Sequence, residues 1–299
     1  MINGFDSSAP RFLADLSRIQ DKMQRAERQI TSGLRVESGS DAPEQVLQIL
    51  RLRSRIEENT QIQTNLTRVE AQVNTAEAAM RQAVSLVERA RTLAAQTATT
   101  GALNRKAMAI EAAQLHERLV ALTGASAEGQ MVFGGDGTVN PPYVVNSAQP
   151  NGVQFTGSST VNSSMVSDEN HVTFRVSKTA TELLDAPGAD NAFAALNDLA
   201  VALTNDDEAQ VQAAIPKIKA ALDHLNRQLA FYGGAQNRVT NASEAAKRSA
   251  VSLKKDLAEL QETDLPAAIL DLNNAKLHHD TALSARAQAP ARSLFDYMG

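Results

Sequence analysis

Three short stretches of the sequence carry side chains that could bind a metal ion or a phosphate group. His278-His279-Asp280 offers metal ligands, but adjacent residues on a helix point in different directions and no His-Glu-x-x-His or Cys/His spacing supports a site. Gly134-Gly135-Asp136-Gly137 lacks the Lys-Ser/Thr pair of a phosphate-binding loop, so we expect a turn. Asp206-Asp207-Glu208 suits the start of a helix better than calcium, whose ligands are spaced through a loop. We therefore predict no metal site.

The composition excludes several classes of function. No Ser/His/Asp, Cys/His or paired-carboxylate arrangement stands out, and the absence of cysteine leaves neither disulfides nor thiolate metal ligands. The formal net charge of -5 argues against a nucleic-acid binder, which needs a clustered surplus of Lys and Arg. No run of about 18 apolar residues is present, so no membrane insertion is expected. We predict a protein that is not an enzyme, with no catalytic residue, no cofactor and no nucleic-acid or membrane partner.

The elements around these stretches are predicted to be long helices. Over residues 8–34, apolar side chains recur at alternating spacings of four and three, the pattern of a coiled-coil stripe. The stripe consists of Phe12, Leu16, Ile19, Met23, Ala26 and Ile30. A turn rich in Ser, Gly and Asp follows, and Asp41 is expected to cap a helix over residues 43–99. At about 1.5 Å per residue that helix spans on the order of 80 Å, which suits a rod. A further helix is expected over 104–123.

The middle of the chain changes character between residues 129 and 180. Gly and Pro interrupt short runs there, and residues 153–156 and 171–176 alternate at period two, which predicts small β-strands. The Ser/Thr-rich stretch 158–167 is expected to be exposed. Helices return after it, and they are expected over 191–203, 206–232, 236–262 and from 266 to about 289. Gly233-Gly234 is expected to break the second of these helices from the third, or to form a turn.

These elements predict a mainly α fold, a rod of long antiparallel helices with a terminal coiled coil and a small β-rich insert. The five predicted segments are an N-terminal coiled coil, the first half of the rod, the β-rich outer insert, the second half of the rod and a C-terminal coiled coil. They cover residues 1–40, 41–128, 129–185, 186–262 and 263–299. The order is palindromic, so the two terminal stripes are expected to pair with each other or with neighbouring copies. An ordinary intramolecular bundle is the alternative interpretation of such stripes.

Short motifs at both ends resemble the bacterial flagellin family, and the resemblance covers almost the whole chain. Residues 29–36, Gln-Ile-Thr-Ser-Gly-Leu-Arg-Val, followed by residues 40–43, are similar to the family's signature where the terminal helix meets the first long helix. Many relatives carry two acidic residues before the Pro or Ala, where only Asp41 stands here. At the other end, residues 236–239, 262–264 and 285–289 are similar to the C-terminal region of the family.

Two further stretches are similar to the family's hook–filament junction members, the hook-associated proteins of the flagellin type. They are residues 132–135 followed by 141–143, and the terminal run 293–298. The resemblance implies a structural subunit of the bacterial flagellum that serves motility, with filament flagellin as the alternative. A cytoplasmic coiled-coil scaffold is the alternative from another class.

The same resemblance implies an extracellular destination, reached by type III export without a cleaved signal peptide. The implied partners are copies of the chain, neighbouring axial proteins (another hook-associated protein and flagellin) and an export chaperone. The paired terminal helices would form the assembly interface, because each large apolar side chain that becomes buried contributes about 1.5–3 kcal/mol. The predicted interface residues are Phe12, Leu16, Ile19, Met23, Leu265, Ile269, Leu272 and Leu283.

Overall fold

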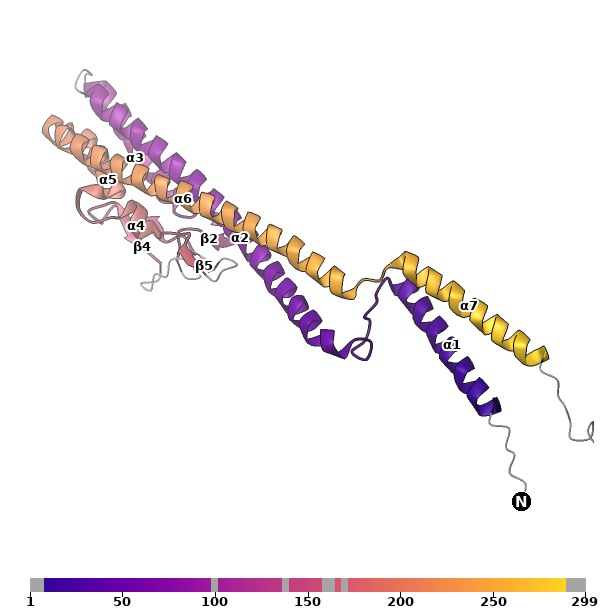
Figure 1. Cartoon of the computed structure of the whole chain (residues 1–299). Helices are drawn as coiled ribbons and strands as arrows, with labels where there is room; N and C mark the ends of the chain where they lie inside the picture. Colours follow the sequence, from indigo (N-terminus) through magenta and orange to yellow (C-terminus); the bar gives the residue numbers. More distant parts are fainter. Residues whose placement is uncertain (1–7, 98–101, 136–139, 158–164, 168–171, 289–299) are drawn as a thin grey trace, which may run out of the picture. The chain divides into compact units, whose positions relative to one another are not determined.

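The structure is a computed structural model that describes residues 8–97, 102–135, 140–157, 165–167 and 172–288 (Figure 1). The described part contains seven α-helices, one short 3-10 helix and six short strands, which confirms the predicted mainly α fold. The chain divides into two compact units. The first unit comprises Met1–Glu58 with Ala250–Gly299, and the second unit comprises Asn59–Ser249.

In the first unit, α1 (Ser8–Ser32) and α7 (Leu265–Gln288) lie side by side (Figure 1). They are antiparallel. Just beyond the end of α1, the carbonyl of Gly33 accepts a hydrogen bond of 3.0 Å from the amide of Thr263, just before the start of α7. At the opposite ends, the guanidinium of Arg286 lies 5.7 Å from the centre of the Phe12 ring. The coiled-coil stripe predicted on the first helix is therefore placed against the last helix of the same chain.

The longest helices are α2 (Pro43–Thr97) and α6 (Glu208–Gln261). The predicted start of α2 at Pro43 is confirmed, since Pro tolerates the first position of a helix. The expectation that Asp41 caps this helix is wrong. Pro43 is the first helical residue, so the capping position falls on Ala42, and the carboxylate of Asp41 turns back to accept the amides of Glu37 and Ser38 at 3.1 and 2.7 Å.

The expected break at Gly233-Gly234 is also wrong, because α6 runs through both glycines. Glycine in a helix interior costs roughly 1 kcal/mol relative to alanine, but tertiary packing overrides such a cost. Tyr232 and Ala235 on either side of the pair, and Val239 one turn further on, are buried in the core of the second unit. Burial of these flanking side chains holds the helix continuous through a sequence that would break an isolated one.

The second unit has one large apolar core, which α2 and α6 share with α3 (Ala102–Leu122) and α5 (Ala192–Thr204). Its largest fully buried side chains come from all four helices and include Leu66, Met80, Leu119, Phe193 and Tyr232. Periodic Leu, Val and Ala residues supply most of the remaining core, as expected of helices that pack on one another.

The strands form three separate antiparallel pairs. They are β1 (Ser126–Ala127) with β2 (Gln130–Met131), β3 (Tyr143–Val145) with β4 (Val153–Phe155), and β5 (Met165–Ser167) with β6 (Thr173–Arg175). The strands expected over 153–156 and 171–176 correspond to β4 and β6, although residue 171 lies outside the described residues. The stretch 158–167 was expected to be loop, yet its last three residues form β5, while residues 158–164 lie outside the described part.

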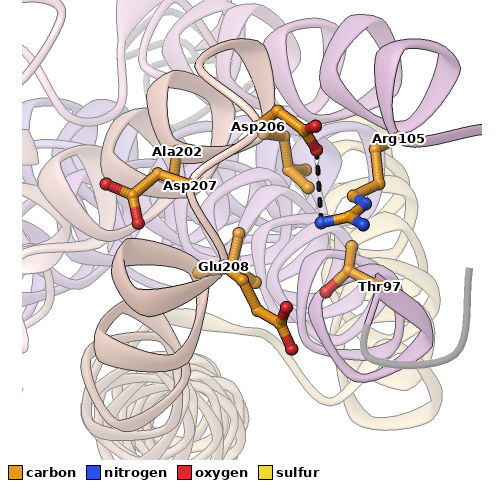
Figure 2. A pocket seen from close by; sticks show the side chains of 8 residues that line it. Thr97, Arg105, Ala202, Asp206, Asp207 and Glu208 are labelled. Atoms are coloured by element: carbon orange, nitrogen blue, oxygen red, sulfur yellow. Dashed lines mark ion pairs between the residues drawn. The ribbon is translucent and has the colours of Figure 1, made fainter. Parts of the chain in front are cut away.

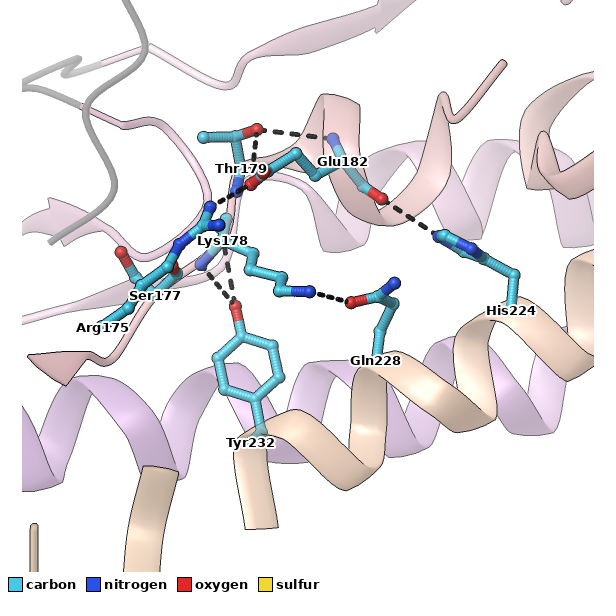
Figure 3. Close-up of polar contacts among 8 residues, drawn as sticks. All are labelled: Arg175, Ser177, Lys178, Thr179, Glu182, His224, Gln228 and Tyr232. Atoms are coloured by element: carbon cyan, nitrogen blue, oxygen red, sulfur yellow. Dashed lines mark hydrogen bonds and ion pairs between the residues drawn. The ribbon is translucent and has the colours of Figure 1, made fainter. Parts of the chain in front are cut away.

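A polar network holds the segment after β6 against α6 (Figure 3). Thr179 and Glu182 form a capping box at the start of α4 (Ala180–Leu184), and Glu182 is also ion-paired with Arg175. The hydroxyl of Tyr232 on α6 accepts the amide of Lys178 at 3.2 Å, and the Lys178 ammonium donates to the side chain of Gln228 at 2.6 Å. The 3-10 helix η1 (Gly188–Asp190) follows α4 and leads into α5. The β-rich insert is thus anchored to the rod by α6.

Candidate assembly surface

The apolar face of α1 is turned toward α7. Phe12, Leu16, Ile19 and Met23, the four predicted interface residues of this helix, are half-buried, and Ala26 on the same stripe is buried. Charged side chains occupy the rest of the helix surface, and Leu13 is the one large apolar side chain of α1 that is mainly exposed among its described residues. This helix therefore has a single apolar stripe, which α7 already covers in part.

The side of α7 that faces α1 is built mainly from small residues. Ala268 and Ala275 are buried there, and Leu272 between them is half-buried. Arg286, on the same stripe three turns further along, lies over Phe12. Of the four interface residues predicted on this helix, the structure places Leu272 against α1. The alanines were missed because the prediction followed large apolar residues, although Ala268, Leu272 and Ala275 keep the alternating spacing of four and three.

The other predicted residues of α7 belong to a second apolar surface. Leu265, Ile269 and Leu283 are 44%, 48% and 43% exposed, and Leu270 and Leu277 are 62% and 64% exposed. Leu270 and Leu277 are two turns apart and lie on the side of the helix away from Ala268 and Ala275. Their spacing of seven was the signal that could have found them. We call these five leucine and isoleucine residues the outer surface of α7.

The first unit as a whole is poor in core and rich in exposed apolar groups. Apart from the α1–α7 pair, its apolar cluster consists of Val36, Ala42 and Ile49, with Leu257 and Leu260 packed against them. Nine of the fifteen large apolar side chains that are exposed in the described part of the chain lie in this unit. Monomeric proteins rarely leave contiguous apolar surface in water, and its presence marks sites of protein association.

Two segments that are distant in the sequence meet where α1 ends and α7 begins. Residues 33–36 run antiparallel to residues 260–263, with Leu34 bridged to Glu262, and we call these two segments the clasp. The amide of Arg35 donates to the carbonyl of Gln261 at 2.7 Å, and the buried side chain of Gln261 donates to the carbonyl of Val36 at 3.2 Å. The clasp falls within motifs 29–36 and 262–264, on which the family resemblance depends.

The turn between the clasp and α2 is stabilised by one carboxylate. The Asp41 side chain accepts hydrogen bonds from the amides of Ser38 and Glu37 and from the Ser38 hydroxyl. Hydrogen bonds from Ser38, backbone first, lower the pKa of Asp41, so this carboxylate is ionised at neutral pH. Its role is to hold the turn that leads from α1 into α2.

The stretches with ligand-like side chains form no metal centre. Within the described residues, no group of three or more His, Cys, Asp or Glu side chains is placed to hold an ion. His278 is exposed and His279 is half-buried on the α1 side of α7. Residues 136 and 137 of the glycine-rich stretch lie outside the described part.

The acidic run 206–208 lines a small cleft formed with Thr97 and Arg105 (Figure 2). Asp206 is ion-paired with Arg105 at 3.2 Å, and the Asp207 carboxylate accepts the amide of Gln210 at 3.0 Å. Asp207 thus occupies the first turn of α6, where the helix dipole favours negative charge. The cleft is a meeting point of helix ends, where a guanidinium and a cap use two of the three acidic groups.

No described helix has a stretch that is both apolar and long enough to cross a lipid bilayer. The helical ends of the chain match two family models. Residues 7–138 match the bacterial flagellin N-terminal helical region, and residues 215–298 match the bacterial flagellin C-terminal helical region. No curated protein sequence matches the chain.

Several solved structures share the fold. A flagellar hook-associated protein of Vibrio parahaemolyticus aligns with a TM-score of 0.64 at 19% identity, over 74% of this chain and 100% of that one. The hook-associated protein-3 of Legionella pneumophila aligns with a TM-score of 0.61 at 14% identity, over 71% and 98%. FlgL of Bacillus cereus aligns with a TM-score of 0.54 at 19% identity, over 71% and 100%.

Proposed function

Because the chain belongs to the bacterial flagellin family, we propose that it is a structural subunit of the bacterial flagellum that assembles through its terminal helices. The observation that carries this proposal is the outer surface of α7, five large apolar side chains left exposed on a helix whose opposite side already packs on α1. An apolar face without a partner in its own chain is suited to bury itself against another copy or another axial protein.

The size of this surface fits a polymer better than an isolated dimer. Burying the exposed remainder of five Leu and Ile side chains contributes on the order of 5–10 kcal/mol. Association of two free molecules costs about 4–15 kcal/mol in lost translational and rotational freedom. One such contact is therefore weak, whereas a subunit held by several neighbours in a heterologous, helical arrangement gains the contact more than once. The arrangement favours a subunit that is stable in an axial structure and monomeric outside it.

Within the flagellum, we propose a place at the junction between hook and filament. The solved structures described above are hook-associated proteins, and the stretches 132–135 and 141–143 are similar to junction members of the family. In the structure this region leads into β3, with Phe133 and Tyr143 buried against the rod. Immunogold labelling of intact cells separates the alternatives. Label confined to the hook–filament boundary supports the junction role, and label along the filament supports filament flagellin.

This role implies a non-catalytic protein that leaves the cell through the flagellar export apparatus and becomes part of the extracellular flagellum. Its partners would be copies of itself and adjacent axial proteins, such as another hook-associated protein and flagellin, with an export chaperone before secretion. The five segments 1–40, 41–128, 129–185, 186–262 and 263–299 would then place the coiled-coil ends toward the axis of the assembly. The insert would lie on its outside.

Charge substitutions on the terminal helices test the proposal. Ile269→Asp changes the outer surface of α7, Leu16→Asp changes the α1 stripe, and Ile110→Asp is the matched control, because Ile110 is 63% exposed on α3 in the second unit. Each variant is expressed in a strain that lacks the natural gene, and its incorporation into flagella is measured together with swimming. We expect both terminal variants to be lost from flagella and the control to be incorporated. Normal flagella built with Ile269→Asp would contradict the proposed interface.

A further inference from the structure

The pair formed by α1 and α7 buries little apolar surface of its own. The residues of this pair that are fully buried are Ala26, Ala268 and Ala275, and the larger side chains between the helices are half-buried. Helices of 25 and 24 residues are marginal in water when packing is weak. Side-chain burial between α1 and α7 is thus a modest force for holding them together in a single chain.

The clasp supplies hydrogen bonds that side-chain burial does not. Arg35 donates from its guanidinium to the carbonyl of Leu260 at 2.7 Å and to the side chain of Gln45 at 3.0 Å, while its amide bonds to Gln261. The carbonyls of Leu260 and Gln261 are in the last turn of α6, where helices have unpaired acceptors and favour a positive charge. The same contacts therefore end α6 and fix the entrance of α7.

On the other strand, Gln261 is the buried member of the clasp. Its side chain is 6% exposed, and its amide group donates to the carbonyl of Val36 at 3.2 Å. The amide of Thr263 returns a bond of 3.0 Å to the carbonyl of Gly33, which adopts a positive φ of 71°. The left-handed conformation of Gly33 turns the chain out of α1 and into the clasp.

We propose that Arg35 and Gln261 are positioning residues that preset the pairing of α1 with α7 in the single chain, before any second copy binds. The clasp joins the two helices at one end, so the remaining stripe meets at high effective concentration and closes from that end. The register is set by the Leu34–Glu262 bridge, which brings the Phe12 stripe opposite the alanines of α7. The outer surface of α7 is then displayed on an ordered helix, and the entropy cost of ordering it is met before assembly.

Only the consequence for assembly rests on the proposed function; the pairing itself is a property of the isolated chain. Because the chain has no cysteine, two labels can be placed at will. Gln24 on α1 and Asn274 on α7 are exposed and lie at about the same level of the antiparallel pair. Gln24→Cys and Asn274→Cys, spin-labelled in the otherwise unchanged full chain, report the separation of the two helices by pulsed electron spin resonance in dilute, monomeric protein.

We expect the parent to give one narrow distance distribution, and Arg35→Ala or Gln261→Ala to lose it in favour of a broad one. Arg35→Lys, which keeps a donor and the charge, should restore part of the narrow peak. Arg28→Ala, which removes an exposed arginine of α1, should leave it unchanged. Circular dichroism checks that the second unit is folded in every variant. A broad distribution in the parent, or a narrow one in both alanine variants, would overturn the proposal. Neither result bears on incorporation into flagella, which the Ile269→Asp test measures separately.

Discussion

The hydroxyl of Tyr143 donates a hydrogen bond of 2.8 Å to the carboxylate of Asp185, 42 residues further along the chain. Burial raises the pKa of Tyr143, so the phenol stays protonated and acts as a donor. The same carboxylate accepts the side-chain amides of Asn151 at 3.2 Å and Asn191 at 2.7 Å. Asp185 therefore ties β3, the loop before β4 and the start of α5 together.

Replacing this carboxylate should weaken the insert without affecting assembly. Asp185→Asn presents donors to donors, so we expect the free energy of unfolding of the second unit to fall by about 1–3 kcal/mol, the cost of unsatisfied buried polar groups. Urea denaturation followed by circular dichroism measures it, with exposed Asp223→Asn on α6 as the control. Equal stability of the two variants would show that the hydrogen bonds to Asp185 do not hold the insert.

The buried His116 should make the second unit less stable in mild acid. Burial lowers the pKa of His116, whose Nε2 lies 3.1 Å from the carbonyl of Asn151. The unfolded chain binds a proton near pH 6.5, where the folded chain does not, so stability falls as the pH drops through about 6.5 and levels off below the folded pKa.

This pH dependence is measured as the urea midpoint at several values between pH 8 and 5. His116→Gln keeps a hydrogen-bond donor and removes the titration, so its midpoint should decline less steeply than that of the parent. Comparing the two slopes cancels the contribution of other histidines. Identical slopes would mean that His116 is protonated equally in both states.

The glycine pair inside α6 should be replaceable by alanine with a gain in stability. A Cβ atom built at Gly233 or Gly234 meets no atom within 4 Å, and neither residue has a positive φ. Each Gly→Ala change removes backbone entropy from the unfolded chain, and we expect it to raise the free energy of unfolding by about 0.5–1 kcal/mol. Thermal unfolding measures the effect. A loss of stability would instead indicate that α6 bends at this pair.

The two sides of α7 should be separable by mutation. Ala275→Leu places a large side chain where α1 packs, and overpacking of this kind costs about 1–3 kcal/mol, so the α1–α7 pair should loosen. Leu277→Asp lies on the outer surface, so it should leave the pair intact in the monomer and prevent incorporation into flagella. The spin-label distance measures the first effect and incorporation measures the second. The interpretation of α7 as two-sided fails if Leu277→Asp also loosens the pair.

Long periodic helices were the most predictable part of the fold. The stripe from Phe12 to Ile30 and the apolar repeat along α2 each describe a helix with a single buried face, and such patterns depend on local sequence alone. The continuity of α6 at Gly233 was not predictable, because it depends on core contacts of Tyr232 and Ala235 with residues far away in the chain. The position of Asp41 failed for a local reason, a single-residue shift between the cap and the turn.

The candidate surface was predicted in part. On α1, large residues mark the face that packs, so sequence and structure select the same side chains. On α7, apolar residues surround the helix, and periodicity could not tell which of them face α1. Small residues decided it, since Ala268 and Ala275 allow the close approach and leave Leu270 and Leu277 outside. Whether the eight residues chosen from the sequence form the interface remains the prediction that the incorporation assay tests.

The clasp could not be predicted from either of its strands. Residues 33–36 and 260–263 are too short to carry a strand pattern, and only the folded chain brings them together. The motifs around them suggested a family, but their physical role is to join two helix ends that are 225 residues apart, as the bond from Arg35 to the Leu260 carbonyl shows.

The core of the second unit is closed by side chains from residues 59–249 alone. A substitution in α1 or α7, however severe, leaves that core untouched, so cells should retain such a variant at normal abundance instead of degrading it. Its absence from flagella can then be attributed to failed attachment. Chains that keep the second unit but cannot attach would accumulate outside the cell, where their amount in the culture medium provides a direct count of missed incorporation events.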